Sequence, residues 1–183
     1  MRTIIDNSNE VYLDANLNKL NEWWIETTST IYKQDRLIYC VKIDDQIMYQ
    51  GYENYIANNF EEIQEIVIET KSKEDSFLDT KVVIDQYLIN FIPACSRIAD
   101  YFYTEMNEER WSEFSQFIKG LNWLIHSFEF LQVLDPTANM NFILNRFEQT
   151  IIDLNDSLTR QEYVLVGDLI KYEILPLLED YVA

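Results

Sequence analysis

The second half of the chain carries apolar residues at helical spacing over long stretches. Between Trp111 and Leu134, apolar side chains recur every three or four residues and form neighbouring stripes on one helix. The first stripe contains Trp111, Phe114, Ile118, Leu121, Ile125 and Phe128; the second contains Phe117, Leu124 and Leu131, with Trp123, Phe130 and Leu134 widening the surface. Because so apolar a helix must be covered by neighbours, we expect it to be the central helix of a bundle.

Three further stretches show the same periodicity. A helix from about residue 74 to residue 104 contains Pro93, where we expect a bend within one continuous helix. Its stripe comprises Phe77, Ile84, Phe91 and Ile98, together with Leu88, Cys95 and Phe102. The last two helices are predicted to begin at Asp135-Pro136 and at a Thr159/Glu162 capping box. The loops between these helices are short, which favours an antiparallel up-down bundle of about four long helices.

Helix ends and one glycine refine this prediction. Ser72 or Asp75 is expected to cap the first helix of the bundle, and Asn107 the central one. Gly120 lies in the middle of the central helix, where glycine costs about 1 kcal/mol relative to alanine. That cost predicts a close crossing with another helix at Gly120.

The N-terminal part follows a different pattern. Asp14 is expected to cap a helix that runs to about Lys33. A hairpin from Leu37 to Gln50 that turns at Asp44-Asp45 is expected to follow. A short helix over 52–60 and a third strand over 65–70 complete this part. The first 13 residues are compatible either with a short strand or with a poorly ordered end.

The predicted fold is therefore α+β and mostly helical. A small ββαβ unit, within residues 1–71, is expected to pack on the antiparallel helical bundle formed by residues 72–183. We expect the two parts to form one compact globular unit.

The net charge and the apolar content of the chain argue against several kinds of partner. The net charge is −18, and a surface this acidic repels phosphate backbones and anionic lipid. We therefore expect neither a nucleic-acid partner nor a membrane partner. The first residues lack the apolar core of a signal peptide, and no apolar run is long enough to span a membrane, so a cytoplasmic location is expected.

The sequence contains no recognisable catalytic constellation. Cys40 and Cys95 both lie in apolar surroundings, which raise the pKa of a thiol and make it less reactive. Metal-ligand spacings, a G-x-S-x-G turn and glycine-rich phosphate loops do not occur. We expect no catalytic residue, no cofactor and no metal ion, and hence a protein that is not an enzyme.

Two sets of side chains are candidates for a binding site. Asp168 and Glu173 lie in an apolar stretch, and with His126 they could line a polar pocket inside the bundle. The alternative is that they form structural contacts, for Asp168 with Arg146, Arg160 or a tyrosine hydroxyl, and for His126 at the surface.

The second set is aromatic. Trp23, Trp24 and Trp123 exceed what the helix stripes require, and exposed tryptophans often mark a protein-binding patch. The alternative is that they belong to a large hydrophobic core.

Two segments support a resemblance. They resemble segments of an uncharacterised bacterial family. The first segment, from Glu162 to Leu178, is E-Y-V-L-V-G-D-L-I-K-Y-E-I-L-P-L-L, and the second, from Lys42 to Ile56, is K-I-D-D-Q-I-M-Y-Q-G-Y-E-N-Y-I. In that family a small hairpin unit precedes a helical bundle. The resemblance implies a fold and a bacterial cytoplasmic setting, and it implies no activity and no functional residue.

The leading hypothesis is a non-enzymatic, acidic protein-interaction module, such as an adaptor or a chaperone-like helical bundle. The first alternative is a small-molecule-binding or enzymatic bundle that uses the inward polar residues. The second is an acidic mimic of nucleic acid. Surplus apolar surface also makes a homodimer possible.

Overall fold

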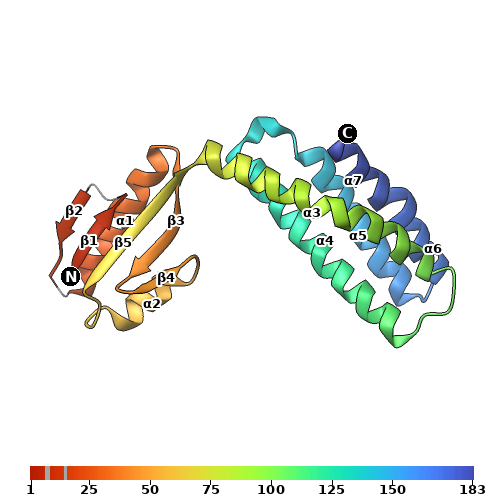
Figure 1. Cartoon of the computed structure of the whole chain (residues 1–183), viewed down its shortest axis with the longest axis horizontal. Helices are drawn as coiled ribbons and strands as arrows, with labels where there is room; N and C mark the ends of the chain where they lie inside the picture. The colour runs from red at the N-terminus through yellow and green to blue at the C-terminus, as the bar shows by residue number, and fades with distance from the viewer. Residues whose placement is uncertain (7–8, 15) are drawn as a thin grey trace. The chain divides into compact units, whose positions relative to one another are not determined.

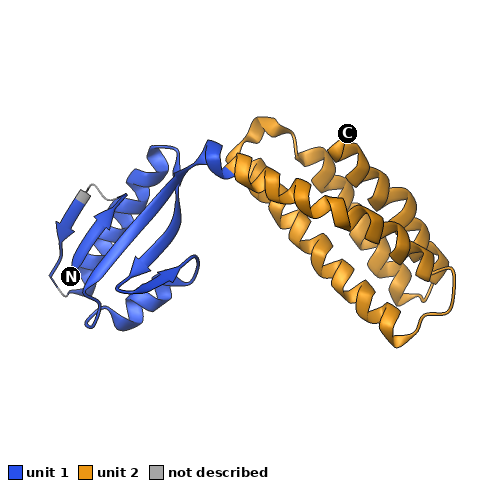
Figure 2. Cartoon of the chain, viewed as in Figure 1, with its two compact units in different colours: residues 1–76 blue, residues 77–183 orange. Residues whose placement is uncertain are grey.

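The chain divides into two compact units, Met1–Ser76 and Phe77–Ala183 (Figure 2). The structure, a computed structural model, describes residues 1–6, 9–14 and 16–183. The predicted α+β, mostly helical fold class is confirmed, with a small sheet in the first unit and a helical second unit. The predicted division after residue 71 lies five residues before the division between the units.

The first unit contains a five-stranded sheet in the order β2-β1-β5-β3-β4 (Figure 1). β1 and β5 are parallel, and the other neighbouring pairs are antiparallel. The unit has one helix between its two antiparallel hairpins along the chain. Its elements are β1 (Arg2–Ile5), β2 (Asn9–Tyr12), α1 (Leu17–Lys33), β3 (Arg36–Ile43), β4 (Gln46–Met48), α2 (Tyr52–Asn59) and β5 (Glu65–Ser72).

One face of the sheet forms the core of this unit. Ile66 and Ile68 of β5 point to the same face, since alternate residues of a strand share a side, and both are fully buried. The helices cover that face with Leu20 and Ile31 of α1 and with Ile56 of α2. Burial of this apolar face fixes the register, because a slip by one residue would turn the isoleucines to solvent.

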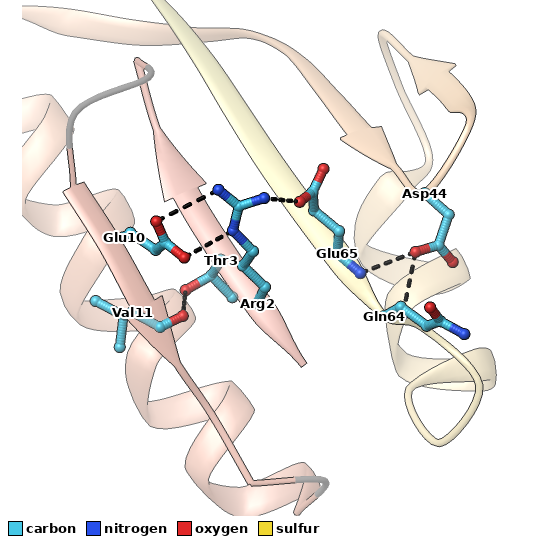
Figure 3. A network of polar contacts seen from close by, with 7 residues as sticks. All are labelled: Arg2, Thr3, Glu10, Val11, Asp44, Gln64 and Glu65. Carbon is cyan, nitrogen blue, oxygen red and sulfur yellow. Dashed lines mark hydrogen bonds and ion pairs between the residues drawn. The ribbon is translucent and has the colours of Figure 1, made fainter.

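Polar contacts tie the strand ends together (Figure 3). Arg2 of β1 donates to Glu10 of β2 at 2.8 Å and to Glu65 of β5 at 2.7 Å, and so links three adjacent strands. Asp44 has a positive φ of 49°, and its carboxylate accepts the backbone N–H groups of Gln64 and Glu65. The predicted Asp44-Asp45 turn is therefore confirmed, and Asp44 also anchors the start of β5.

The hairpin of β1 and β2 lies within the segment that the sequence left ambiguous. Thr3, Ile4 and Ile5 do form a strand, and its partner β5 lies more than 60 residues later in the chain. Thr3 is buried, and its hydroxyl donates to the carbonyl of Val11. The strand thus depends on distant pairing that no local pattern reveals.

The second unit is built from four long helical segments (Figure 1). The first three are α3, α4 and α5, and the fourth, called here the fourth rod, is α6, η2 and α7 in direct succession. Helix α3 begins just before the boundary between the units. The elements are α3 (Lys73–Tyr101), α4 (Glu108–Leu134), the short 3₁₀ turn η1 (Pro136–Ala138), α5 (Asn141–Thr159), α6 (Tyr163–Leu169), η2 (Ile170–Ile174) and α7 (Leu175–Val182).

The predicted stripes form the core of this bundle. Most of the predicted apolar positions of α3 are buried, as are seven of the positions predicted for the central helix α4. These seven are Phe114, Phe117, Leu121, Leu124, Phe128, Leu131 and Leu134. Trp111, Ile118 and Ile125 pack at its margin, whereas Trp123 and Phe130 are about two-fifths exposed.

Two glycines allow close helix crossings against α3. A Cβ atom on Gly120 would lie 2.1 Å from the Tyr87 hydroxyl oxygen and 2.7 Å from Cε2 of Phe91. The close crossing predicted at Gly120 is therefore confirmed. A Cβ atom on Gly167 of α6 would lie 3.0 Å from the carbonyl oxygen of Ala99.

The helix caps are partly as predicted. Ser72 accepts the backbone N–H of Asp75, and Asn107 accepts that of Arg110, so both predicted caps are confirmed. The prediction for Asp14 was wrong. Asn16 caps α1 instead, because its side chain accepts two backbone N–H groups of the first turn.

Two predicted helix starts in the bundle were also wrong. Asp135 caps the short η1 turn, and α5 begins only at Asn141, after Asn139 with a positive φ of 54°. Thr159 is the last residue of α5 and does not start the next helix; its hydroxyl donates to the carbonyl of Asn155 within α5.

The prolines act differently in the two rods that contain them. Helix α3 continues through Pro93, as predicted for one helix. In the fourth rod the π-helical segment η2 lies just before Pro176, and the N–H of Leu175 donates to the carbonyl of Ile170, five residues earlier. The π-helical turn is wider than an α-helical one, and it shifts the backbone carbonyls with which the ring of Pro176 would clash in a regular α-helix.

Candidate functional site

A groove runs between α3 and α7 on the helical unit. Its cavity volume is about 610 Å³, and its walls are mostly apolar. Val82, Ile89 and Pro93 of α3 form one wall, and Tyr181 and Val182 of α7 close it. Volumes of this size are typical of ligand pockets and helix-binding grooves. We take this groove as the candidate site.

The groove exists because α3 has a second apolar stripe that faces solvent. Leu78, Val82 and Ile89 are 53%, 53% and 71% exposed, and Ile92 continues the stripe with a partly buried side chain. These positions are spaced as in a coiled-coil seam, with Asp85 in the place of one apolar residue. A seam that no helix of the unit covers is a surface on which another helix can pack.

Tyr181 closes the groove from α7. Its hydroxyl oxygen is buried and has no hydrogen-bond partner among the described residues. Its ring contacts Phe128 at 4.9 Å between ring centroids. Burial, with a smaller effect of the Asp85 carboxylate, raises the pKa of Tyr181 to about 12. The phenol is therefore neutral at physiological pH and can donate or accept a hydrogen bond.

Tyr181 also lines a second, smaller cavity. It has a volume of about 320 Å³ and is lined by Met140, Phe142, Leu177 and Asp180, among others. Phe142 is 63% exposed. Tyr181 is thus a shared wall between two apolar hollows, which extends the accessible apolar surface around α7.

The charges around the groove are mainly negative. Residues 77–183 contain 17 acidic and 7 basic residues, a net charge of −10. Asp85 lines the groove, and Glu179 and Asp180 precede Tyr181 on α7. None of these three carboxylates belongs to an ion pair with another described residue. The site therefore attracts cations more strongly than anions.

Pro93 adds a backbone acceptor to the same wall. Proline has no N–H group, so the carbonyl of Ile89 lacks the donor that the fourth residue along a helix normally supplies. Both residues line the groove. The wall of the groove therefore contains a backbone carbonyl without its helical donor, whereas the hydroxyl of Tyr181 is buried behind it.

The polar residues singled out in the sequence lie apart from this groove. His126 contacts Glu129 on its own helix at 2.9 Å, and its side chain is 78% exposed. The hydroxyl of Tyr103 donates to Asp168 at 2.7 Å, and Arg146 forms an ion pair with Glu173. The three residues have three separate partners, and none of them lines the groove.

The partner of Asp168 is the tyrosine hydroxyl that was one of the predicted alternatives. Loss of solvent around Tyr103, together with its hydrogen bond to Asp168, raises the pKa of Tyr103 to about 12. Lys171 lies over the ring of Tyr103 and pairs with Asp100 at 2.8 Å. These contacts tie α6 and η2 to the end of α3, which is a structural role.

The predicted tryptophans fall in different places. Trp23 and Trp24 lie on α1 in the first unit, where Trp24 contacts the rings of both Trp23 and Tyr52. Trp123 lies on α4, is 39% exposed and packs on Tyr87. Trp23 and Trp24 belong to the first unit, whereas Trp123 belongs to the second.

The cysteines behave as predicted. Burial raises the pKa of the Cys95 thiol to about 12, and burial followed by a hydrogen bond to Glu69 raises that of Cys40. Neutral thiols are poor nucleophiles. Within residues 1–6, 9–14 and 16–183, no group of three or more His, Cys, Asp or Glu side chains is placed to hold a metal ion.

The groove was not predicted from the sequence, although the apolar residues of its wall do show helical spacing. Val82 and Ile89 fall seven residues apart, next to the buried positions of the same helix. Periodicity alone reports that a helix has apolar stripes, and it does not say which stripe is left uncovered.

Comparison with known proteins identifies a family for this chain, and it identifies no activity. A search of curated proteins found no match, and a search of solved structures also found none. No helix in the described part of the chain is both long and apolar enough to cross a membrane. A domain of unknown function (DUF8042) matches residues 79–182, which include the groove and most of the helical unit. Since this match covers more than half of the chain, the protein belongs to the DUF8042 family, a family whose function is uncharacterised.

Proposed function

We propose that the protein is a non-enzymatic interaction module whose groove between α3 and α7 binds an amphipathic helix of a partner protein. The observation that carries the proposal is the solvent-facing stripe of Val82 and Ile89 beside a groove of about 610 Å³. An amphipathic helix in an apolar groove is a common mode of peptide recognition.

The length of the groove suits a short helix. From Lys81 to Pro93 the wall on α3 extends about 18 Å, since a helix rises 1.5 Å per residue. A partner helix of about 12 residues would cover this length and present apolar side chains from three successive turns. Such a helix would complete the coiled-coil seam that α3 already offers.

The charge of the unit selects a basic partner. Asp85, Glu179 and Asp180 lie along the groove or beside Tyr181 without an ion-pair partner, whereas Lys81 is the single basic residue among those that line it. Lysine or arginine residues flanking the apolar face of the partner would pair with these carboxylates and speed up the encounter. A donor side chain could also reach the Ile89 carbonyl.

The wider setting expected from the sequence is part of the same proposal. A bacterial cytoplasmic adaptor, or a chaperone for a client that exposes such a helix, would fit an acidic bundle with an open seam. The enzymatic alternative has less support, because His126, Asp168 and Glu173 have separate partners and both thiols have raised pKa values.

A pair of designed peptides tests the proposal. One is a helix of about 14 residues with leucines on one face and lysines on the other, and the second has glutamates in place of the lysines. Titration followed by NMR should show binding of the lysine peptide, with shifts at Val82, Ile89 and Tyr181. Equal binding of the glutamate peptide would contradict the charge argument.

A variant separates the groove from general electrostatic attraction. Ile89→Asp adds a negative charge, so non-specific attraction of the lysine peptide would increase, whereas docking in the groove would weaken by about tenfold or more. Ile152→Asp is the matched control, since Ile152 is 51% exposed on α5 and does not line the groove. Equal affinity of the two variants would refute the proposal.

Self-association is the competing occupant. Sedimentation would detect a dimer, and a dimer that Ile89→Asp dissociates would assign the groove to a second copy of the chain. That outcome would overturn the proposal of a basic partner.

A further inference from the structure

The first unit contains a pocket of its own between α1 and α2. Its volume is about 360 Å³, and it is independent of the groove described above. Leu20 and Ile56 form its floor and are both buried, with 3% and 5% of their surface exposed. An apolar floor of this kind holds the hydrocarbon part of a ligand.

The wall of the pocket combines an aromatic ring with a carboxylate. Trp24 and Glu53 both line it, and the indole N–H of Trp24 lies 3.4 Å from the Glu53 carboxylate. This long contact keeps the two side chains together and leaves the carboxylate with free acceptor sites. Tyr52 supports Trp24 from the side, with 5.7 Å between the ring centroids.

The charge of the pocket is negative. Glu53 is the single charged residue among those that line it, and the other polar groups are the amides of Asn21 and Asn54. Glu53 forms no ion pair with any residue that the structure describes. The unit from residue 1 to residue 76 contains 15 acidic and 7 basic residues, so its overall field also favours cations.

We propose that this pocket binds an organic cation, an ammonium or guanidinium group on a short apolar stem. The stem would lie on Leu20 and Ile56, and the charged group would reach the Glu53 carboxylate beside the Trp24 ring. A carboxylate provides charge-assisted hydrogen bonds to such a group. An anion or a neutral ligand of the same shape would lack this interaction.

NMR titration of the full chain tests this proposal. The probe is n-butylammonium, with n-butylguanidinium as a second cation and 1-butanol and butyrate as matched neutral and anionic controls. The reporter is the indole N–H resonance of Trp24, assigned by its loss in Trp24→Phe. Both cations should shift this resonance, whereas neither control should.

Glu53→Gln keeps the shape of the side chain and removes its charge. Because Glu53 is exposed, we expect the affinity for butylammonium to fall by about two- to fivefold. Unchanged amide resonances of β5 would show that the unit remains folded. Equal shifts by butanol, no shift by either cation, or equal affinity in Glu53→Gln would each overturn the proposal.

A further titration distinguishes two possible sources of the cationic group, a protein side chain and a free small molecule. N-acetyl-lysine N-methylamide represents a lysine side chain of a protein, and butylammonium represents a free amine. Tighter binding of the lysine derivative supports the pocket as a reader of a protein side chain. Tighter binding of the free amine supports a small-molecule site.

Discussion

The two units differ in the distance along the chain over which their buried side chains meet. In the helical unit the core residues lie on stripes that repeat within one helix, and Phe128 shares its stripe with Leu121, seven residues away. In the first unit Ile66 and Ile68 lie on a strand that pairs with β1 across more than 60 residues. Helical stripes arise locally, whereas a sheet depends on partners brought together by the fold.

The hollows of the two units reflect this difference. The groove of the helical unit is long and apolar, because it is an uncovered stripe of a regular helix. The pocket of the first unit is smaller and chemically mixed, since two helices cross the sheet and bring Trp24 next to Glu53. A groove of the first kind suits another helix, and a pocket of the second kind suits a single side chain or a small ligand.

The largest expected effect tests the core of the helical unit. Phe128→Ala should lower the free energy of unfolding by about 3–5 kcal/mol, because Phe128 is fully buried and the ring leaves a cavity. Urea unfolding followed by circular dichroism measures it. Phe142→Ala is the control, and since Phe142 is 63% exposed its cost should stay below about 1 kcal/mol. Equal costs would contradict the assigned core.

A glycine in each unit gives the second test. Gly120→Ala should destabilise the bundle by about 1–3 kcal/mol, because the new methyl group meets Phe91 and Tyr87. Gly51 has a φ of 71° and no atom within 4 Å of an added Cβ, so Gly51→Ala should cost about 1 kcal/mol through backbone strain alone. If Gly120→Ala were neutral, as at an ordinary exposed helix position, the close crossing of α3 and α4 would be refuted.

The turn that joins β3 and β4 provides a third test, in the first unit. Asp44→Ala removes the acceptor of two backbone N–H groups and should destabilise the sheet by about 1 kcal/mol or somewhat more. Hydrogen exchange of the amides of β5 would report the change. Asp45→Ala, in the same turn, is the control and should leave the exchange rates nearly unchanged. Equal effects of the two substitutions would argue against an anchoring role for Asp44.

The smallest expected effect concerns Tyr181. At neutral pH, Tyr181→Phe removes a buried hydroxyl without a partner and should raise the stability by up to about 1 kcal/mol. The ordinary pKa of tyrosine is 10.0, and in the folded protein that of Tyr181 is raised to about 12. The wild-type protein should therefore lose stability as the pH rises through this window, because the unfolded chain releases the proton first.

Urea titrations at neutral pH and at about pH 11 would separate these two effects. Tyr181→Phe should reduce the loss of stability at the higher pH. Tyr172→Phe is the control, since Tyr172 is 64% exposed. A pH dependence identical in wild type and Tyr181→Phe would show that the hydroxyl is not buried.

Much of the helical unit could be predicted from the sequence. The stripes of α3 and α4, the caps at Ser72 and Asn107 and the close crossing at Gly120 all follow from spacing and local chemistry. Helix positions are encoded within a few turns, so a single sequence contains the necessary information. The hairpin of β3 and β4 with its turn at Asp44 was predictable for the same reason.

The candidate sites depended on the tertiary structure. The sequence singled out Trp24, yet its neighbour Glu53 lies on another helix and 29 residues away. It also suggested a shared role for His126, Asp168 and Glu173, and each of these found a different partner. Sequence spacing cannot state which helices become neighbours.

The sequence by itself determined that the second unit is a bundle of long helices with apolar stripes, because helical periodicity is a property of a continuous segment. Only the tertiary structure decided which stripe of α3 remains open, since that depends on where α7 lies along α3. It likewise decided the pairing of β1 with β5. The physical reason is the same in both cases: burial is a property of two surfaces in contact, and the chain sequence describes each surface separately.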